Sequence, residues 1–284
     1  MQTIDQVPQM QAWSDRAREA GKRIGFVPTM GYLHEGHISL VQEARRRADR
    51  CVVSIFVNPL QFGPSEDLSR YPRDLDRDRD QLSQAGVDAL YLPTATAMYP
   101  DGFQTQVDVT EVTSGLCGTS RPGHFRGVTT VLAKLFNTVK PHVTFFGEKD
   151  FQQLVTVQRM VRDLDFGIEV VGMPIVREDD GVAMSSRNKY LSSDEREAAR
   201  CLSRALSDAQ RIVAGGERSV ELLRHQVEKT IEGEPLARID YVDLVDIENL
   251  RAVTRIEQPT LLALAVRFGA TRLIDNTVLE PVGG

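Results

Sequence analysis

The sequence predicts an α/β fold, a Rossmann-like doubly wound parallel sheet followed by a smaller C-terminal α+β domain. Two observations predict it. Short apolar, β-branched runs alternate with amphipathic stretches of helical period through the first part of the chain. Beyond about residue 190, helical stretches are instead followed by closely spaced strand-like runs. We therefore expect a first domain at residues 1–178 and a second at residues 179–284.

The first domain is expected to consist of repeated strand–helix units. The runs IGFVP and CVVSIFV suit strands that are buried on both faces of a parallel sheet. In chain order, the patterns predict strands at 24–28, 51–57, 88–92, 143–146 and 169–172, and helices at 36–49, 73–85, 127–139 and 150–164. Ligands of such folds bind beyond the carboxyl ends of the strands, so chemistry is expected in the loops there.

The second domain begins with a helix-start signal. Ser192 and Glu195 form a capping-box pattern, with Ser192 as N-cap, which predicts a long helix to about Ala214. Gly215 and Gly216 end that helix, and a second helix is expected to run to about residue 231. The strand-like runs that follow lie at 238–245, 261–268 and 272–279.

Composition excludes several classes of protein. The chain has 284 residues, of which 41% are hydrophobic and 26% charged, as in soluble globular proteins rather than disordered ones. Its net charge of −6 argues against non-specific binding to nucleic acid or to a membrane surface. The cysteines (Cys51, Cys117 and Cys201) show neither metal-ligand nor redox spacing, which indicates a cytoplasmic protein. We expect no signal peptide and no membrane-spanning helix.

Two histidines follow the first predicted strand, in the segment PTMGYLHEGH. His34 and His37 are three residues apart at a predicted helix start, so they share one face of its first turn. Gly31 and Gly36 allow the backbone to approach a ligand closely. Exposed N–H groups at a helix start attract phosphate, and histidines there can stabilise charge developing on phosphorus. Two alternatives remain: a structural histidine pair, and a zinc site, although the metalloprotease motif needs histidines four apart.

Two later loops carry positive charge after predicted strands. Lys149 lies in FGEKD, between a strand and a helix that Asp150 is expected to cap, and it would point a charge toward phosphates. The segment 184–188 (MSSRN) places two hydroxyls and a guanidinium together, which suits a triphosphate. A surface lysine and an ordinary polar turn are the alternatives. The chain contains neither a Walker A motif, nor a dinucleotide fingerprint, nor a hydrolase nucleophile elbow.

These three loops together resemble the nucleotidyltransferase superfamily, and the similarity is closer to one of its families. Six segments occur in that family's order: PTMGYLHEGH, FVNPLQFGPSED, YPRD, RPGHFRGV, FFGEKDFQQ and DGVAMSSRNKYLS. They resemble the pantothenate synthetase (pantoate–β-alanine ligase) family and cover most of the first domain. The resemblance implies that ATP, with Mg²⁺, condenses pantoate with β-alanine to give pantothenate, AMP and pyrophosphate through a pantoyl adenylate. It also implies a homodimer, an ATP- and pantoate-binding first domain and a second domain that acts as a lid.

The resemblance also implies roles for individual residues. It implies catalytic roles for His37, His34, Lys149 and Arg187. It implies that ATP is contacted by Met30, Gly31, Tyr32, Leu33, His34, Glu35, Gly36, His37, Gly147, Glu148, Lys149, Asp150, Val176, Met184, Ser185, Ser186 and Arg187. The matching substrate-binding residues are Gln61, Gln153, Met30, Arg121 and His124. Asp78 matches an acid associated with Mg²⁺, with Asp76 and Asp80 as alternatives, and Tyr32 replaces a residue that is commonly small.

Two competing hypotheses remain at this stage. The chain could be a nucleotidyltransferase that moves AMP or CMP onto a phosphate ester and stops there. The second domain and the glutamines Gln61 and Gln153 favour the ligase over it, because paired amides suit the carboxylate and hydroxyls of pantoate. The chain could also be a non-catalytic nucleotide-binding regulator, which has no need to keep His34, His37 and Lys149.

Overall fold

The computed structural model describes residues 1–64 and 66–281, and the chain groups into two compact units. Three segments form the first unit: Met1–Thr110, Arg121–Glu148 and Thr156–Pro174. The second unit contains Glu111–Ser120, Lys149–Val155 and Ile175–Gly284. The expected functional boundary between residues 178 and 179 stays a prediction, because spatial grouping does not test what each part does.

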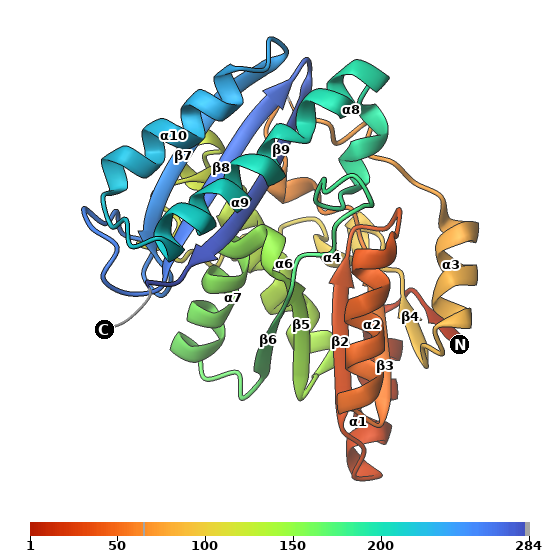
Figure 1. Cartoon of the computed structure of the whole chain (residues 1–284). Coiled ribbons are helices and arrows are strands. Elements are labelled where there is room, and N and C mark those ends of the chain that lie inside the picture. Colours follow the sequence, from red (N-terminus) through yellow and green to blue (C-terminus); the bar gives the residue numbers. More distant parts are fainter. Residues whose placement is uncertain (65, 282–284) are drawn as a thin grey trace. The chain divides into compact units, whose positions relative to one another are not determined.

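The described residues of the first unit form a six-stranded parallel sheet in the order β1-β4-β3-β2-β5-β6 (Figure 1). The strands are β1 (Gln2–Ile4), β2 (Ile24–Thr29), β3 (Arg50–Ile55), β4 (Ala89–Tyr91), β5 (Val143–Gly147) and β6 (Glu169–Met173). The helices are α1 (Val7–Glu19), α2 (Glu35–Arg47), η1 (Pro59–Gln61), α3 (Leu75–Gln84), α4 (Ala95–Met98) and α6 (His124–Val139). The short helix η2 (Glu148–Asp150) and α7 (Phe151–Asp163) contribute residues to both units.

Helices cover both faces of this sheet, as a doubly wound fold requires. Phe26 of β2 packs edge-on against Phe136 of α6, with ring centroids 6.3 Å apart. The next residue, Val27, points to the other face, where it joins Leu40 and Val41 of α2 in a buried cluster. Successive strand residues point to opposite faces, so the continuous apolar run of β2 reflects burial on both sides. The predicted fold class is confirmed.

The order of the strands shows where a ligand can bind. β2 pairs with β3 on one side and with β5 on the other, and the chain crosses from β2 to β3 through α2. The loops that follow β2 and β5 therefore leave neighbouring strands at the same, carboxyl edge of the sheet. Such a change of direction in the strand order is where open α/β sheets bind ligands.

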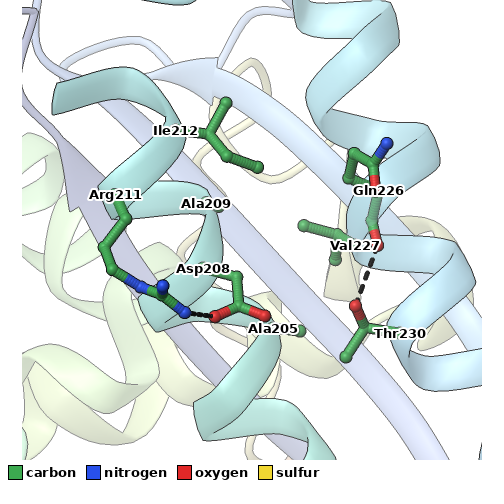
Figure 2. A pocket seen from close by; sticks show the side chains of 8 residues that line it. All are labelled: Ala205, Asp208, Ala209, Arg211, Ile212, Gln226, Val227 and Thr230. Atoms are coloured by element: carbon green, nitrogen blue, oxygen red, sulfur yellow. Dashed lines mark hydrogen bonds and ion pairs between the residues drawn. The ribbon is translucent and has the colours of Figure 1, made fainter. Parts of the chain in front are cut away.

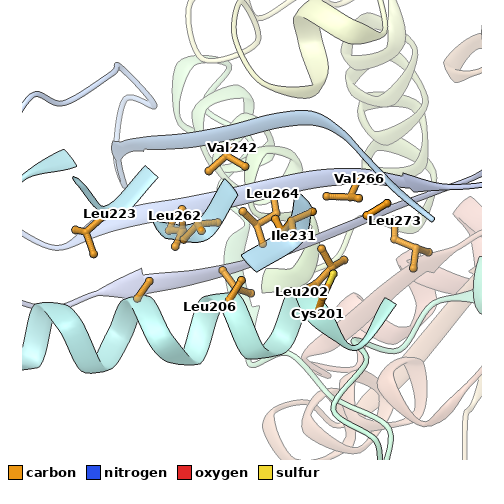
Figure 3. Packing of buried hydrophobic residues seen from close by; sticks show 14 of the residues in the cluster. Cys201, Leu202, Leu206, Leu223, Ile231, Val242, Leu262, Leu264, Val266 and Leu273 are labelled. Atoms are coloured by element: carbon orange, nitrogen blue, oxygen red, sulfur yellow. The ribbon is translucent and has the colours of Figure 1, made fainter. Parts of the chain in front are cut away.

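The second unit has a three-stranded antiparallel sheet and helices that pack on it (Figure 1). Its elements are α5 (Cys117–Ser120), η3 (Ser186–Tyr190), α8 (Ser193–Ala199), α9 (Cys201–Ala214), α10 (Val220–Glu232), β7 (Ala237–Asp246), β8 (Thr260–Phe268) and β9 (Thr271–Leu279). Figure 3 shows Leu202 and Leu206 of α9 directed toward the strands, and these residues share one core with Leu223 and Leu262. The α+β character expected here is confirmed.

Several local expectations need correction. The capping box is present, because Ser192 Oγ accepts from the Glu195 N–H and Glu195 Oε2 accepts from the Ser192 N–H. The expected single helix to Ala214, however, is interrupted at Arg200, whose N–H bonds the Glu197 carbonyl three residues back and tightens that turn. Asp150 ends the short helix η2, which runs directly into α7, so the chain is already helical at the expected cap.

Other elements have no counterpart in the sequence-based expectations. The strand β1 and the helix α1 lie in a segment for which we predicted no helix or strand, only that it is not a signal peptide. Pro8 stands in the first turn of α1, a common helix-start signal. The helix α6 begins at His124, three residues before the expected start, so His124 is helical and not part of a preceding loop.

Candidate active site

The loop after β2 reverses direction through two residues in the left-handed region. Gly31 has φ +82° and Tyr32 has φ +52°. A Cβ atom on Gly31 would lie 2.9 Å from Ile55 Cγ2 and 3.1 Å from Asp78 Oδ2, so only glycine fits there without displacing its neighbours. The ring of Tyr32 lies 5.3 Å from the Arg77 guanidinium on α3. The Tyr32 side chain therefore lies beside Arg77 of α3.

The two histidines lie at the start of α2, as the spacing predicts. His34 is the N-cap, His37 is the third helical residue, and their ring centroids are 4.0 Å apart. The His34 N–H donates to Nδ1 of His37 over 3.3 Å. In a neutral ring the proton of His37 then lies on Nε2, which can donate to an oxygen. Two half-buried imidazoles at a helix N-terminus form a site suited to phosphate oxygens.

Gln61 meets the histidine loop through Met30. Its Nε2 donates to the Met30 sulfur over 3.3 Å, and its Oε1 accepts from Asn58 Nδ2 over 3.1 Å. Asn58 is only 1% exposed, and its Oδ1 accepts from the Tyr99 hydroxyl over 2.7 Å. These bonds fix which way the Gln61 amide points, so its donor end is the one beside Met30. Sequence reasoning missed Asn58, although a polar residue in an otherwise apolar stretch is a usable signal.

Arg121 and His124 are joined to the backbone of Gln61. Arg121 Nε and Nη2 donate to the two carboxylate oxygens of Glu66 over 2.6 and 2.8 Å. The Arg121 guanidinium also approaches His124 Nε2 at 2.8 Å, and His124 Nδ1 lies 2.8 Å from the Gln61 carbonyl. Since arginine only donates, Nε2 accepts and Nδ1 carries the proton that bonds Gln61. His124 thus links the Arg121 guanidinium to the Gln61 carbonyl.

Glu66 carries the charge that balances Arg121. Burial of its carboxylate opposes ionisation, but the hydrogen bonds and the charge of Arg121, with a further bond from the Gly63 N–H, lower the pKa of Glu66 to about 2. The ion pair is therefore fully formed at neutral pH. It holds the Arg121 guanidinium within hydrogen-bond distance of His124 and the Gln61 carbonyl.

The second unit carries Lys149, Asp150, Gln153 and the later predicted residues, whereas Gly147 and Glu148 belong to the first unit. The Lys149 side chain is 17% exposed and lies 3.9 Å from the Asp150 carboxylate, and the Lys149 carbonyl accepts from Asn276 on β9 over 2.9 Å. On α7, Gln152 is buried, and its amide bonds the backbone of Val112, Gly115 and Cys117. Its neighbour Gln153 is half-buried.

The other predicted ATP segments of this unit lie together. The Met184 N–H donates to the Val176 carbonyl over 2.9 Å, and Arg177 pairs with Ala183 across the same short hairpin. Arg177 donates twice to Asp275 of β9, over 2.7 and 3.0 Å. The Ser185 hydroxyl accepts from the Arg187 N–H. The structure therefore joins Val176 to the Ser-Ser-Arg loop, which sequence spacing did not predict.

A network of charges supports this hairpin. Arg196 of α8 donates to Glu178 and Asp180, over 2.7 Å in each case. Burial opposes ionisation of Glu178, but its hydrogen bond with Arg196 lowers its pKa. The hydrogen bond with Arg196 is also the main reason that the pKa of Asp180 is lowered. Both carboxylates therefore stay charged at neutral pH and hold the hairpin to α8.

Asp78, which the resemblance links to Mg²⁺, bonds the backbone of the loop after β2, and its metal role stays a prediction. It is 1% exposed, and its two oxygens accept from the backbone N–H groups of Tyr32 and Leu33 over 2.7 and 2.8 Å. Asp76 and Asp80, the alternatives, lie exposed on α3. Within residues 1–64 and 66–281, His, Cys, Asp and Glu form no group of three able to hold a metal ion.

A hollow in the second unit has a lining of its own. This hollow, of about 350 Å³, is lined by residues of α9 and α10. Figure 2 shows Asp208, Arg211 and Thr230 among them. The lining includes none of the predicted site residues, and Asp208 and Arg211, both on α9, form an ion pair within the lining. No helix in the described part of the chain is long and apolar enough to span a membrane.

The fold and the paired histidines define a nucleotide-binding α/β enzyme, and comparisons with known proteins give its family. The family model for pantoate-beta-alanine ligase matches residues 2–278. The pantothenate synthetase of Geobacter sulfurreducens is 59% identical over 279 residues, which cover 98% of this chain and 99% of that protein. That of Heliobacterium modesticaldum is 57% identical over 280 residues, covering 99% and 100%.

Solved structures agree with this assignment. The crystal structure of pantothenate synthetase from Thermus thermophilus is similar with a TM-score of 0.94 and 48% identity, covering 99% of this chain and 100% of that one. The pantoate-beta-alanine ligase of Francisella tularensis, complexed with beta-gamma ATP and beta-alanine, has a TM-score of 0.82 and 33% identity, covering 98% and 97%.

The chain belongs to the pantoate-beta-alanine ligase family. It is a ligase of pantothenate biosynthesis that joins the carboxyl group of pantoate to the amine of β-alanine. This assignment selects the ligase over both the nucleotidyltransferase that stops after transfer and the non-catalytic regulator.

Proposed function

We propose that the enzyme activates pantoate with ATP and uses the residues described above for that step. The pantoate carboxylate attacks the α-phosphorus of ATP, forming a pantoyl adenylate and expelling pyrophosphate. The amine of β-alanine then attacks the acyl carbon, so that the acyl–phosphate bond breaks, AMP leaves and the amine loses a proton. The complex of the Francisella relative with beta-gamma ATP and beta-alanine supports both co-substrates.

One observation carries the proposal: a single loop joins the phosphate and acid functions. His34 and His37 stand at the start of α2, and four residues earlier Met30 contacts the donor end of Gln61. Donors of this kind can hold phosphate oxygens on one side and the pantoate carboxylate or hydroxyls on the other. Positioning and charge stabilisation are the contributions that adenylation requires, because the protein forms no covalent bond itself.

We assign the other residues as the family resemblance implies. Lys149 and Arg187 supply positive charge for the phosphates, and Gln153 supplies a second amide for pantoate. Val176 and the Met184–Arg187 segment, joined in one hairpin, contact the nucleotide together with Gly147 to Asp150. Arg121 and His124 act on substrate through Gln61, because their described bonds lead to its carbonyl and to Glu66.

Four further properties belong to this proposal. Mg²⁺ accompanies ATP and needs no cage of carboxylates, since it usually keeps waters and takes substrate phosphates as ligands. Residues 179–284 act as a lid, because a mixed anhydride must be shielded from water. The enzyme is a homodimer, as the resemblance implies. It works in the cytoplasm, which its three buried free cysteines support.

Isotope exchange tests the first half-reaction. With pantoate and ATP but without β-alanine, labelled pyrophosphate is expected to enter ATP, because the adenylate forms reversibly before the amine is needed. Omitting pantoate is the control and is expected to abolish exchange. Exchange that strictly requires β-alanine would exclude a free-standing adenylate step and overturn the proposed mechanism.

A further inference from the structure

We propose that Asp78 is a positioning residue that holds the histidine loop in its reactive shape and does not bind metal. The inference rests on the proposed role of that loop in binding ATP. It starts from the two backbone N–H groups that converge on one buried carboxylate: Tyr32 to Oδ2 over 2.7 Å and Leu33 to Oδ1 over 2.8 Å.

The loop conformation explains why a carboxylate is needed there. Gly31 and Tyr32 both have positive φ, and the left-handed region is unfavourable for a residue such as tyrosine. Successive N–H groups that point the same way form a small concavity that binds anions. The Asp78 carboxylate is that anion. Its two hydrogen bonds stabilise the strained turn and occupy the N–H groups of Tyr32 and Leu33. The phosphate groups of ATP therefore bind the N–H groups at the start of α2 and the two imidazoles.

The helix α3 holds the loop at further points. Arg77 donates to the Leu33 carbonyl over 3.1 Å, and its guanidinium faces the Tyr32 ring. The Asp74 side chain caps α3 by accepting from the Arg77 N–H, and Leu82 anchors the same helix in the core cluster that includes Leu33. Asp78 thus lies on a helix that is itself held in place. A residue can position a loop only if its own support is rigid.

The decisive variant is Asp78→Asn. An asparagine fills the same space but presents an amino group to one of the two N–H donors, so one bond is lost and two donors oppose each other. In the protein without ATP or metal, we expect the amides of residues 31–33 to exchange hydrogen at least ten times faster than in wild type. We expect kcat/KM for ATP to fall about 10- to 100-fold, while the Mg²⁺ concentration for half-maximal activity stays within twofold.

The control is Leu82→Ala, which removes a core side chain of α3 but keeps the Asp78 carboxylate and its two bonds to the loop. It is expected to lower the melting temperature at least as much as Asp78→Asn, yet leave exchange at residues 31–33 near wild type when both are measured well below that temperature. If Leu82→Ala accelerates loop exchange equally, Asp78 has only a general structural role and the proposal fails.

Two other outcomes would contradict the positioning role of Asp78. An Asp78→Asn enzyme with unchanged loop exchange and a Mg²⁺ requirement raised tenfold or more would make Asp78 a metal ligand. Unchanged values for both would remove it from either role. Hydrogen exchange at residues 31–33 is measured without substrate or turnover. Its result therefore tests the role of Asp78 even if the pyrophosphate-exchange experiment on the wild-type enzyme contradicts the proposed function.

Discussion

Lys149 is a loop residue whose side chain is nevertheless largely covered, with 17% exposure. We expect Lys149→Ala to slow single-turnover formation of pantoyl adenylate about 100- to 1,000-fold, the usual loss for one preorganised donor. The stability loss is expected to be about 1 kcal/mol, because truncation also removes the covered aliphatic stem. Quench measurements of adenylate, with melting temperatures alongside, check both values.

The matched variant is Lys149→Arg. It keeps the charge but spreads it over a planar fork, so we expect only partial recovery of the rate. A near-normal rate in Lys149→Ala would show that the lysine takes no part in the chemistry, and it would weaken the assignment of the surrounding residues to ATP.

Glu66 makes stability depend on pH. Its pKa is about 2 in the folded protein against an ordinary value of 4.5. A lowered pKa adds stability above pH 4.5, on the order of 3 kcal/mol, and this is lost as the pH falls toward 2. Urea unfolding is expected to show Glu66→Gln less stable than wild type at pH 7, with the difference reduced to less than half at pH 3. An equal difference at both values would mean that the ion pair is not its source.

Sequence reasoning identified the residues that carry recognisable chemistry and missed those that hold them. His34, His37 and Gln61 stand out because they occur in motifs. Asn58 stands out only as a polar residue in an apolar stretch, and the roles of Asn58 and Gln152 depend on partners far along the chain, such as Gly127 for Asn58. Asp78 was assigned to Mg²⁺ because it matches an acid of the family that the sequence resembles. Only the folded chain shows that backbone N–H groups from a distant loop occupy it.

At the level of elements, long periodic segments were predictable and short ones were not. The strands β2 and β3 and the helix α2 between them show strong patterns, because both faces of the sheet are buried. The strand β1 is three residues long and is defined by its pairing with β4, which no local pattern encodes. The start of α6 depends on Gly123, which adopts φ +82° immediately before His124.

The approach of α6 to η1 gives a prediction about elements. A Cβ atom on Gly127 would lie 2.3 Å from the Leu60 carbonyl oxygen and 2.7 Å from Gln61 Cα. Gly127→Ala is therefore expected to push these elements apart, at a stability cost of about 1–3 kcal/mol, and to raise the KM for pantoate by displacing Gln61. Calorimetry and steady-state kinetics measure the two effects.

Gly115→Ala is the control for that substitution. Nothing lies within 4 Å of a Cβ atom built on Gly115. The free energy of unfolding of the Gly115→Ala variant is expected to stay within about 0.5 kcal/mol of wild type, with an unchanged KM for pantoate. If Gly127→Ala behaved in the same way, Gln61 would not depend on the spacing between α6 and η1.

For the whole molecule, the path of the chain predicts how the two units unfold. The chain passes between them five times, after residues 110, 120, 148, 155 and 174. The helix α7 belongs partly to each unit, with residues to Val155 in the second and the rest in the first. Loosening one unit therefore removes residues that the other needs for its own hydrogen bonds and core, so we expect both to unfold together.

The cysteines allow this expectation to be measured. Cys51 lies in the first unit and Cys201 in the second, and both are fully buried. Burial raises the pKa of each thiol to about 12, so neither is a reactive thiolate at neutral pH while folded. Thiol labelling across a denaturant series, read by mass spectrometry, is expected to give the same midpoint for both. Midpoints separated by more than the error of measurement would show that the units unfold independently, as two domains divided at residue 178 would do.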